Sequence, residues 1–375
     1  MGLMIFPKKF YEKFEDLIEI QRVLAQQSIN DLTGSPGPKT LLKGDTQAGF
    51  YGFVMPEQMG AISANPPGNQ AYNGVNLALA LGLASGTVFN SNVPLMKFHY
   101  KGKVLFIPLT GYRHSLAWDA IYNAGIAYQT TDEGFLPPAG RVGLDLSIDD
   151  TDNSINCTDQ RFLGDKTSSM DYADTVGTIG DTLILKGWSN DDNNKTVIID
   201  SITNTKIIVT GATLVTEQGG KKARFYKESA KVTQGKTISI GTKTYRVYLM
   251  KGAGNDPTDS YGDSDKGAEG PGNMWNSLIL PLHEHAKIGN WNYPAYAVDA
   301  NGDIITSDWN IGLTDENLRT HYQYGSGSYT WCQEVIDNAT WRRVSRGYFG
   351  ASYLGGDYSW SARSDGCWRP VLEVL

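Results

Sequence analysis

The residue types that could hold a metal ion are few and poorly spaced in this sequence. His283 and His285 lie two residues apart in "LHEH", whereas zinc ligands on a helix recur four residues apart, as in HExxH. No third ligand accompanies them, so we expect no zinc site. The acidic stretches at 149–152 and 256–265 offer oxygen ligands for Ca²⁺, but neither follows the EF-hand order with its closing Glu. We interpret both as solvated loops, with Ca²⁺ binding as the alternative, and expect no metal and no cofactor.

The residues that could act as nucleophiles do not form a recognisable catalytic motif. The three cysteines (Cys157, Cys332 and Cys367) are odd in number and widely spaced, which argues against a disulfide framework and a zinc ribbon. Cys332 and Cys367 lie next to tryptophans in predicted strands, where buried thiols are inert. GxSxG and P-loop patterns are absent from the sequence. We therefore expect a protein that is not an enzyme, while a carboxylate pair for glycoside hydrolysis, brought together by the fold, stays an alternative.

The composition favours a β-rich protein. The chain has 375 residues, of which only 19% are charged, with 42 Gly, 20 Tyr and 9 Trp. A net charge of −7 and the lack of a basic cluster disfavour a nucleic-acid partner. The apolar run at 75–88 is too short and too glycine-interrupted to cross a bilayer, so we expect no membrane insertion. Residues 1–20 lack the order of a secretion signal, which fits a protein made in the cytoplasm.

The strongest helix signal lies at the N-terminus, over residues 7–28. Pro7 suits a first helical turn, and one apolar stripe runs along the segment. The stripe consists of Phe10, Phe14, Leu17 and Leu24. Two interpretations stay open: an assembly helix that bundles with copies of itself, and a helix that packs back on the following domain.

Two β-hairpins are predicted from alternating apolar runs that meet at a glycine. The first spans 94–109 and turns at Lys101-Gly102, and the second spans 236–252 and turns at Gly241. Glycine supplies the positive φ that such tight turns need.

Two further helices are predicted between these strands. Residues 114–125 are predicted to form a helix, with Ser115 as its N-cap and Gly125 at its C-terminal end. Residues 274–285 are expected to be helical up to Pro281, which cannot continue a helix.

The domain organisation follows from a shift in composition. Between 146 and 235, short β-branched runs alternate with Gly, Asn and Asp turns, the pattern of a small β-sandwich or barrel. We interpret 146–235 as a domain inserted into a loop of a larger one, which would comprise 36–145 and 236–375. Residues 1–35 form the N-terminal helix and its linker.

The end of the chain resembles the closing signature of the C-type-lectin-like fold in its formylglycine-generating-enzyme-like variety. That signature is an Arg-Gly-Gly-aromatic turn, then an Arg, then Gly-aromatic-Arg before the final strand. The matching positions are Arg346, Gly347, Tyr348, Arg363, Gly366, Trp368 and Arg369. Two departures are that Tyr348 and Phe349 replace the second glycine and its neighbour, and that Cys367 separates Gly366 from Trp368. The cysteine-dependent activity of those enzymes does not carry over.

The wider pattern resembles structural proteins of tailed-bacteriophage virions. Five motifs occur in the order found there, and the 180–215 segment is similar to a small β module of virion proteins. The motifs are the unit from Lys101 to Gly125, the hairpin from Tyr245 to Ala253, "WN" at Trp275 and Asn276, "YTWCQE" at Tyr329 to Glu334, and the "WRPVLE" end. Each motif alone is weakly specific, and their order carries the resemblance, which covers most of 40–375.

The resemblance implies an α+β, β-rich fold: a C-type-lectin-like domain with an inserted small β-sandwich or barrel domain and an N-terminal helix. In such a fold the first and last strands pair, so the chain would end inside a sheet. The aromatic, glycine-rich stretch before that strand would be the contact region. The expected contact residues are Tyr348, Tyr353, Asp357, Tyr358, Trp360 and Arg363. Arg346, Trp368 and Arg369 are expected to be structural, while core packing is the alternative for the contact residues.

The function implied by the resemblance is a binding component of a virion, associated with the tail, baseplate or fibre and assembled in the host cytoplasm. Its expected partners are other virion proteins, further copies of itself and a host-surface glycan or receptor. One alternative is a head, neck or capsid decoration protein with a purely structural role. The other is a polysaccharide-degrading virion enzyme.

Overall fold

The computed structural model describes residues 34–64, 68–130, 140–143, 145–157, 176–220, 222–253, 273–288, 295–336 and 339–375, together with Leu32 and Pro137. Strands account for 39% of this part of the chain and its helices are few and short, which confirms the β-rich character. The described strands form three large sheets, with a curled half-barrel among them, and one two-stranded sheet.

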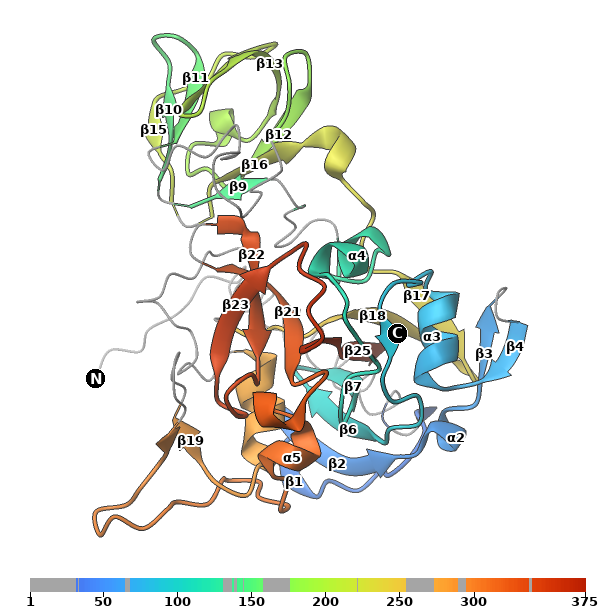
Figure 1. Cartoon of the computed structure of the whole chain (residues 1–375). Helices are drawn as coiled ribbons and strands as arrows, with labels where there is room; N and C mark the ends of the chain where they lie inside the picture. The colour runs from blue at the N-terminus through green and yellow to red at the C-terminus, as the bar shows by residue number, and fades with distance from the viewer. Residues whose placement is uncertain are drawn as a thin grey trace, which may run out of the picture.

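A nine-stranded sheet lies at the centre of the protein (Figure 1), with the order β1-β2-β6-β7-β25-β18-β17-β3-β4. Its strands are β1 (Lys43–Gly44), β2 (Ala48–Val54), β3 (Ala61–Ala64), β4 (Gly68–Ala71), β6 (Leu95–Tyr100), β7 (Lys103–Pro108), β17 (Thr237–Ile240), β18 (Lys243–Leu249) and β25 (Pro370–Val374). The C-terminal strand β25 is antiparallel to both β7 and β18, and Leu372 pairs with Phe106 and Val247. The prediction that the chain ends inside a sheet, beside an early strand, is confirmed.

Both predicted hairpins are confirmed. Between β6 and β7, Lys101 has φ 49° and Gly102 has φ 80°. Between β17 and β18, Gly241 has φ 58°. Two-residue turns with positive φ match the right-handed twist of the flanking strands, which explains why these local sequences fix the register.

The nine-stranded sheet is covered on both faces. Alternation along β25 places Leu372 in one apolar cluster and Val371 in the other. The first cluster includes side chains from α3 (Gly74–Ala80) and α4 (Trp118–Asn123), while α2 (Pro56–Met59) adds Met59. The second includes the π-helical turn η3 (Trp275–Ile279) and the 3-10 turn η4 (Leu280–Leu282). The sheet is therefore the middle layer of the main body.

A six-stranded sheet carries the C-terminal aromatic region, with the order β23-β22-β21-β24-β8-β5. Its strands are β5 (Thr87–Val88), β8 (Arg113–His114), β21 (Tyr329–Ile336), β22 (Ala339–Arg346), β23 (Leu354–Tyr358) and β24 (Gly366–Trp368). Strands β21 and β24 are parallel, and the other pairs are antiparallel. The segment before β21 holds the two-stranded sheet of β19 (Lys287–Ile288) and β20 (Ala295–Tyr296), then α5 (Asp315–Leu318) and η5 (Tyr322–Tyr324).

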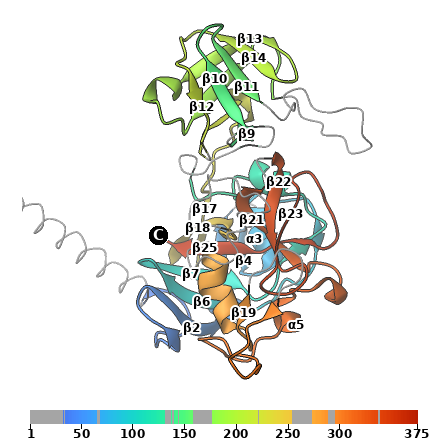
Figure 2. The ribbon, with the colours of Figure 1, turned by 90° about the vertical axis from the view of Figure 1, so that its left-hand side faces the viewer.

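The eight-stranded sheet has an apolar core of its own, which includes Leu183 and Ile199. In Figure 2 it stands above the rest of the protein. Its strands are β9 (Arg141–Val142), β10 (Leu146–Asp149), β11 (Ser154–Cys157), β12 (Thr182–Lys186), β13 (Thr196–Ile202), β14 (Lys206–Thr210), β15 (Glu217–Gln218) and β16 (Arg224–Lys227), with 3-10 turns η1 (Asp191–Asn193) and η2 (Glu228–Ala230). Strand β9 precedes residue 146, and the domain boundaries drawn from the sequence stay a prediction.

The start of the helix expected at 114–125 is wrong. Helix α4 begins after Ala117, whereas Ser115 has φ 52° and its hydroxyl lies 2.9 Å from His114 Nδ1. A residue in that left-handed region cannot have the extended backbone of an N-cap. The expected stop is confirmed, because Gly125 follows the helix with φ 78°.

The helix expected over 274–285 is also corrected. Residues Trp275–Ile279 form a π-helical turn, and Leu280–Leu282 continue as a 3-10 turn. Pro281 has no N–H to extend the helical ladder, so the regular α-helix does not form.

The residues of the predicted assembly helix, Phe10, Phe14, Leu17 and Leu24, lie outside the described part of the chain. None of the helices within the described ranges is long and apolar enough to cross a membrane.

The position of β25 gives a test of its contribution to stability. Leu372 is fully buried, and Leu375, just beyond the strand, is 44% exposed. We expect Leu372→Ala to lower the free energy of unfolding by about 2–5 kcal/mol, because the substitution leaves a cavity in the packed core. Leu375→Ala, as the matched control, is expected to cost less than about 1 kcal/mol. Urea unfolding of both variants measures the difference, and equal losses would contradict the central position of β25.

Candidate functional site

Four aromatic side chains, Tyr322, Tyr348, Phe349 and Tyr353, gather at the turn between β22 and β23, and we call them the aromatic cluster. The ring centroid of Phe349 lies 4.8 Å from that of Tyr348, 5.0 Å from Tyr353 and 5.6 Å from Tyr322. Tyr322 comes from η5, and its N–H donates to the Tyr348 carbonyl at 2.8 Å. Tyr322 is 52% exposed, while the other three are half-buried. The cluster therefore presents ring surface to solvent on a packed base.

Tyr358 and Trp360 form a second aromatic group on the turn that leaves β23. Their rings are stacked, with centroids 5.1 Å apart and planes 19° apart. Trp360 is 37% exposed. The turn is held to α4 because the Asp119 N–H donates to the Ser359 carbonyl at 3.0 Å. This stack offers a flat aromatic face with a fixed orientation.

Asp357 and Arg363 interact with neighbouring protein groups. The Tyr329 hydroxyl donates to Asp357 Oδ2 at 2.9 Å, and Arg363 Nε lies 3.8 Å from the same oxygen. Arg363 also pairs with Asp365 at 3.2 Å. Burial, with the negative charge of Asp357, raises the pKa of Tyr329 well above its usual value. Asp357 thus has an internal role, whereas the exposed Arg363 guanidinium can still reach a ligand.

The structure brings part of the predicted contact set together. Tyr348 lies 6.2 Å from Tyr353 and 6.1 Å from Tyr329, ring to ring, and Tyr329 in turn binds Asp357. Tyr358 follows Asp357 on β23, and successive side chains of a strand point to opposite faces. The stack of Tyr358 and Trp360 is therefore a separate feature.

Arg346, Trp368 and Arg369 are all buried. Arg369 Nε donates to the Pro108 carbonyl at 2.8 Å, and a second nitrogen of the same guanidinium donates to the Leu109 carbonyl. Arg346 donates to Asn276 Oδ1 at 2.7 Å. The two guanidinium groups lie 5.7 Å (Arg346) and 5.5 Å (Arg369) from the ring centroid of Trp275. These residues connect the two sheets to η3.

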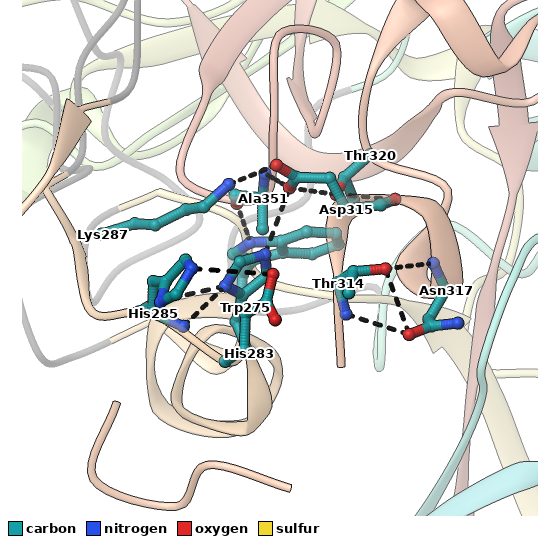
Figure 3. A network of polar contacts seen from close by, with 10 residues as sticks. Trp275, His283, His285, Lys287, Thr314, Asp315, Asn317, Thr320 and Ala351 are labelled. Carbon is teal, nitrogen blue, oxygen red and sulfur yellow. Dashed lines mark hydrogen bonds and ion pairs between the residues drawn. The ribbon is translucent and has the colours of Figure 1, made fainter. Parts of the chain in front are cut away.

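The Asp315 carboxylate is part of a polar network (Figure 3) that bonds to both segments carrying the aromatic cluster. Its Oδ1 accepts the Thr320 hydroxyl at 2.8 Å and the Ala351 N–H at 2.7 Å. Thr320 lies two residues before Tyr322, and Ala351 two residues after Phe349. One carboxylate therefore fixes both segments that carry the cluster.

The charge of Asp315 is balanced by Lys287, and the His283 imidazole lies beside the same carboxylate. Lys287 Nζ bonds to Oδ2, and His283 Nε2 lies 3.5 Å from Oδ1. Burial alone would raise the pKa of Asp315, but the contacts with His283 and Lys287 outweigh it and hold the pKa well below its usual range. The carboxylate stays ionised at any pH near neutral, which keeps the network formed.

The other candidate metal and nucleophile residues have structural surroundings. Within the described part of the chain, no group of three His, Cys, Asp or Glu side chains is placed to hold a metal ion. Asp152 is paired with Lys206 at 2.5 Å. The 256–265 stretch lies outside the described residues.

Burial raises the pKa of the Cys367 thiol to about 11, and the pKa of Cys332 is raised as well. Both thiols are therefore protonated, and so poorly nucleophilic, at neutral pH.

Sequence reasoning missed Tyr322, Tyr329 and Asp315. The segment "HYQYGSGSY" at 321–329 has the same mixture of Tyr and Gly as the predicted contact region, and that composition was the available signal. Nothing in the sequence marks Asp315, because its partners lie far apart along the chain.

No protein-family model, curated protein or solved structure matches this chain.

The Asp315 network gives a second prediction. Asp315→Asn is expected to lower the free energy of unfolding by roughly 3 kcal/mol, because it leaves the buried Lys287 ammonium without its counter-charge. Asp308→Asn, an exposed change in the same region, is the control and is expected to have little effect.

The same network sets a pH dependence. The pKa of Asp315 is lowered in the folded state, so its stabilisation is present above the unfolded pKa of about 3.9 and is lost as the pH falls below it. Unfolding of the wild type and of Asp315→Asn between pH 6 and 2.5 should show a shallower loss in the variant. Identical slopes would contradict the ionised network.

Proposed function

We propose that this protein is a binding component of a tailed-bacteriophage virion, located on the tail, baseplate or fibre. The observation that carries the proposal is the pair of exposed aromatic groups, the cluster around Phe349 and the stack of Tyr358 and Trp360, on the turns of a rigid sheet. Aromatic rings give large contact area at low entropic cost, and this combination of rigidity and exposure suits recognition.

The proposed fold is C-type-lectin-like, with the eight-stranded sheet as its insert. Its support is the C-terminal strand β25, paired with the early strand β7, and the aromatic turns directly before it. The order of the five sequence motifs supports the virion assignment. The N-terminal helix would assemble copies of the chain, so that weak contacts add up to avidity.

The proposed mechanism is contact through fixed rings. The exposed faces of Tyr322 and Trp360 would bind either another virion protein or a host-surface glycan, with Arg363 at the rim. The hydrogen bonds of Asp315 hold the base, so little conformational freedom is lost on binding. The protein acts without catalysis in this account.

Binding of the purified protein to intact cells of the bacterial host tests the proposal. Tyr322→Ala and a Tyr358→Ala/Trp360→Ala variant should each weaken cell binding by at least about tenfold, because aromatic anchors dominate contact energies. Phe53→Ala, which removes a 38% exposed ring on β2 of the nine-stranded sheet, is the matched control. Unchanged binding in both aromatic variants would contradict the proposal.

Two further outcomes separate the alternatives. Location of the labelled subunit on the capsid by imaging, with no cell binding, would favour a decoration protein. Release of soluble sugar from host polysaccharide by the purified protein would show an enzyme instead.

A further inference from the structure

A second surface feature lies at the end of the central sheet and shares no residue with the aromatic groups. It is a pocket of about 130 Å³ over the ends of β6, β7 and β18. Its lining consists of Tyr100, Lys101, Lys103, Leu105, Gln129, Tyr248, Lys251 and Met274. No acidic side chain is among these residues, although the whole chain has a net charge of −7.

Three of the lining residues, Lys103, Gln129 and Tyr248, bind one buried carboxylate, that of Glu373. Glu373 on β25 is buried and pairs with Lys103 at 2.9 Å and with Arg246 at 3.2 Å. It also accepts the Tyr248 hydroxyl at 2.9 Å and the Gln129 amide at 2.9 Å. Glu373 thus has four donors within the protein, and its two ion pairs are with Lys103 and Arg246 rather than with Lys101 or Lys251.

Lys101 and Lys251 supply that positive charge. Within the described part of the chain neither forms an ion pair with a carboxylate, and the Lys101 ammonium lies 5.1 Å from the ring centroid of Tyr100. The wall between them is partly apolar, because Leu105 and Met274 are buried. Such walls focus the field of nearby charges and strengthen it relative to an open surface.

The size of the pocket limits what can enter. Sites that enclose a whole ligand measure about 300–1,000 Å³. A pocket of about 130 Å³ accommodates a single charged group while the rest of the ligand stays outside. We propose that this pocket binds an anionic oxygen group, a carboxylate or a phosphate, that projects from a larger molecule. Lys101 and Lys251 would contact the anion, and the Glu373 network would hold three of the other lining residues.

Titration of the full-length protein with three matched sugars tests the site. Glucuronate, glucose 6-phosphate and neutral glucose share one ring type and differ in the charged group, so amide shifts in the protein NMR spectrum separate carboxylate from phosphate. Binding of at least one anion, and none of glucose, is the expected result. Higher salt should weaken it, because exposed charges are screened.

Variants identify the residues. Lys251→Gln and Lys101→Asn should each weaken anion binding by roughly tenfold, the typical effect of losing one charged hydrogen bond. Asn is chosen at 101 because it tolerates the positive φ there. Lys231→Gln, an exposed lysine elsewhere, is the charge-matched control and should bind as the wild type does. Thermal unfolding confirms that each variant folds.

The proposal is overturned if neither anion binds, if glucose binds equally, or if both pocket variants retain wild-type affinity. It is independent of the aromatic surface. Loss of cell binding in the aromatic variants with unchanged anion binding would leave both assignments standing as separate sites.

Discussion

The Asp315 carboxylate is bound by groups from two segments that are distant along the chain, and the shape of the exposed aromatic surface depends on it. Thr320 precedes the 3-10 turn of Tyr322, while Ala351 lies in the turn that carries Tyr348 and Phe349. The same two turns are also joined by the backbone hydrogen bond from Tyr322 to Tyr348 and by ring contacts. Because Lys287 neutralises the carboxylate, the network can be largely buried without an unpaired charge.

The sheet beneath this network has its own constraint, which is the central position of the last strand. Strand β25 lies between β7 and β18, so the hairpin of β6 and β7 is joined to the hairpin of β17 and β18 through this strand. Just before that strand, Arg369 bonds to the carbonyls of Pro108 and Leu109 and approaches the ring of Trp275. The same ring donates its N–H to the Ala351 carbonyl at 2.7 Å. Trp275 thus connects the core of the central sheet to the turn of the aromatic cluster.

Features that depend on a few neighbouring residues could be predicted from the sequence. The hairpin turns at Lys101 and Gly241 were predictable because positive φ and two-residue loops are local properties. Ser115 was wrongly predicted as an N-cap. A serine before an apolar helix is typical of an N-cap, but the backbone of Ser115 is left-handed. The role of Asp315 could not be predicted, because its partners come from positions 283, 287, 320 and 351 and meet only in the folded chain.

In the candidate site, too, local features could be predicted from the sequence and long-range contacts could not. Tyr348 and Tyr353 were identified from composition, and they do lie within one aromatic group. Tyr322 joins that group through space, from η5 on the other side of β21 in the sequence. Asp357, predicted as a contact residue, accepts the Tyr329 hydroxyl, and its contact role stays a prediction. Exposure and internal pairing decide which residues can meet a partner, and neither is visible in a one-dimensional pattern.

The central claim is that the exposed rings of Tyr322 and Trp360 form a contact surface on a rigid support. Hydroxyl-radical footprinting, read by mass spectrometry at individual side chains, tests it most directly. Both rings should be oxidised readily in the isolated protein and protected when host cell envelopes or the assembled particle are present. Phe53, a 38% exposed ring on β2, should keep the same reactivity throughout. Equal oxidation of Tyr322 and Trp360 under all these conditions would contradict the account.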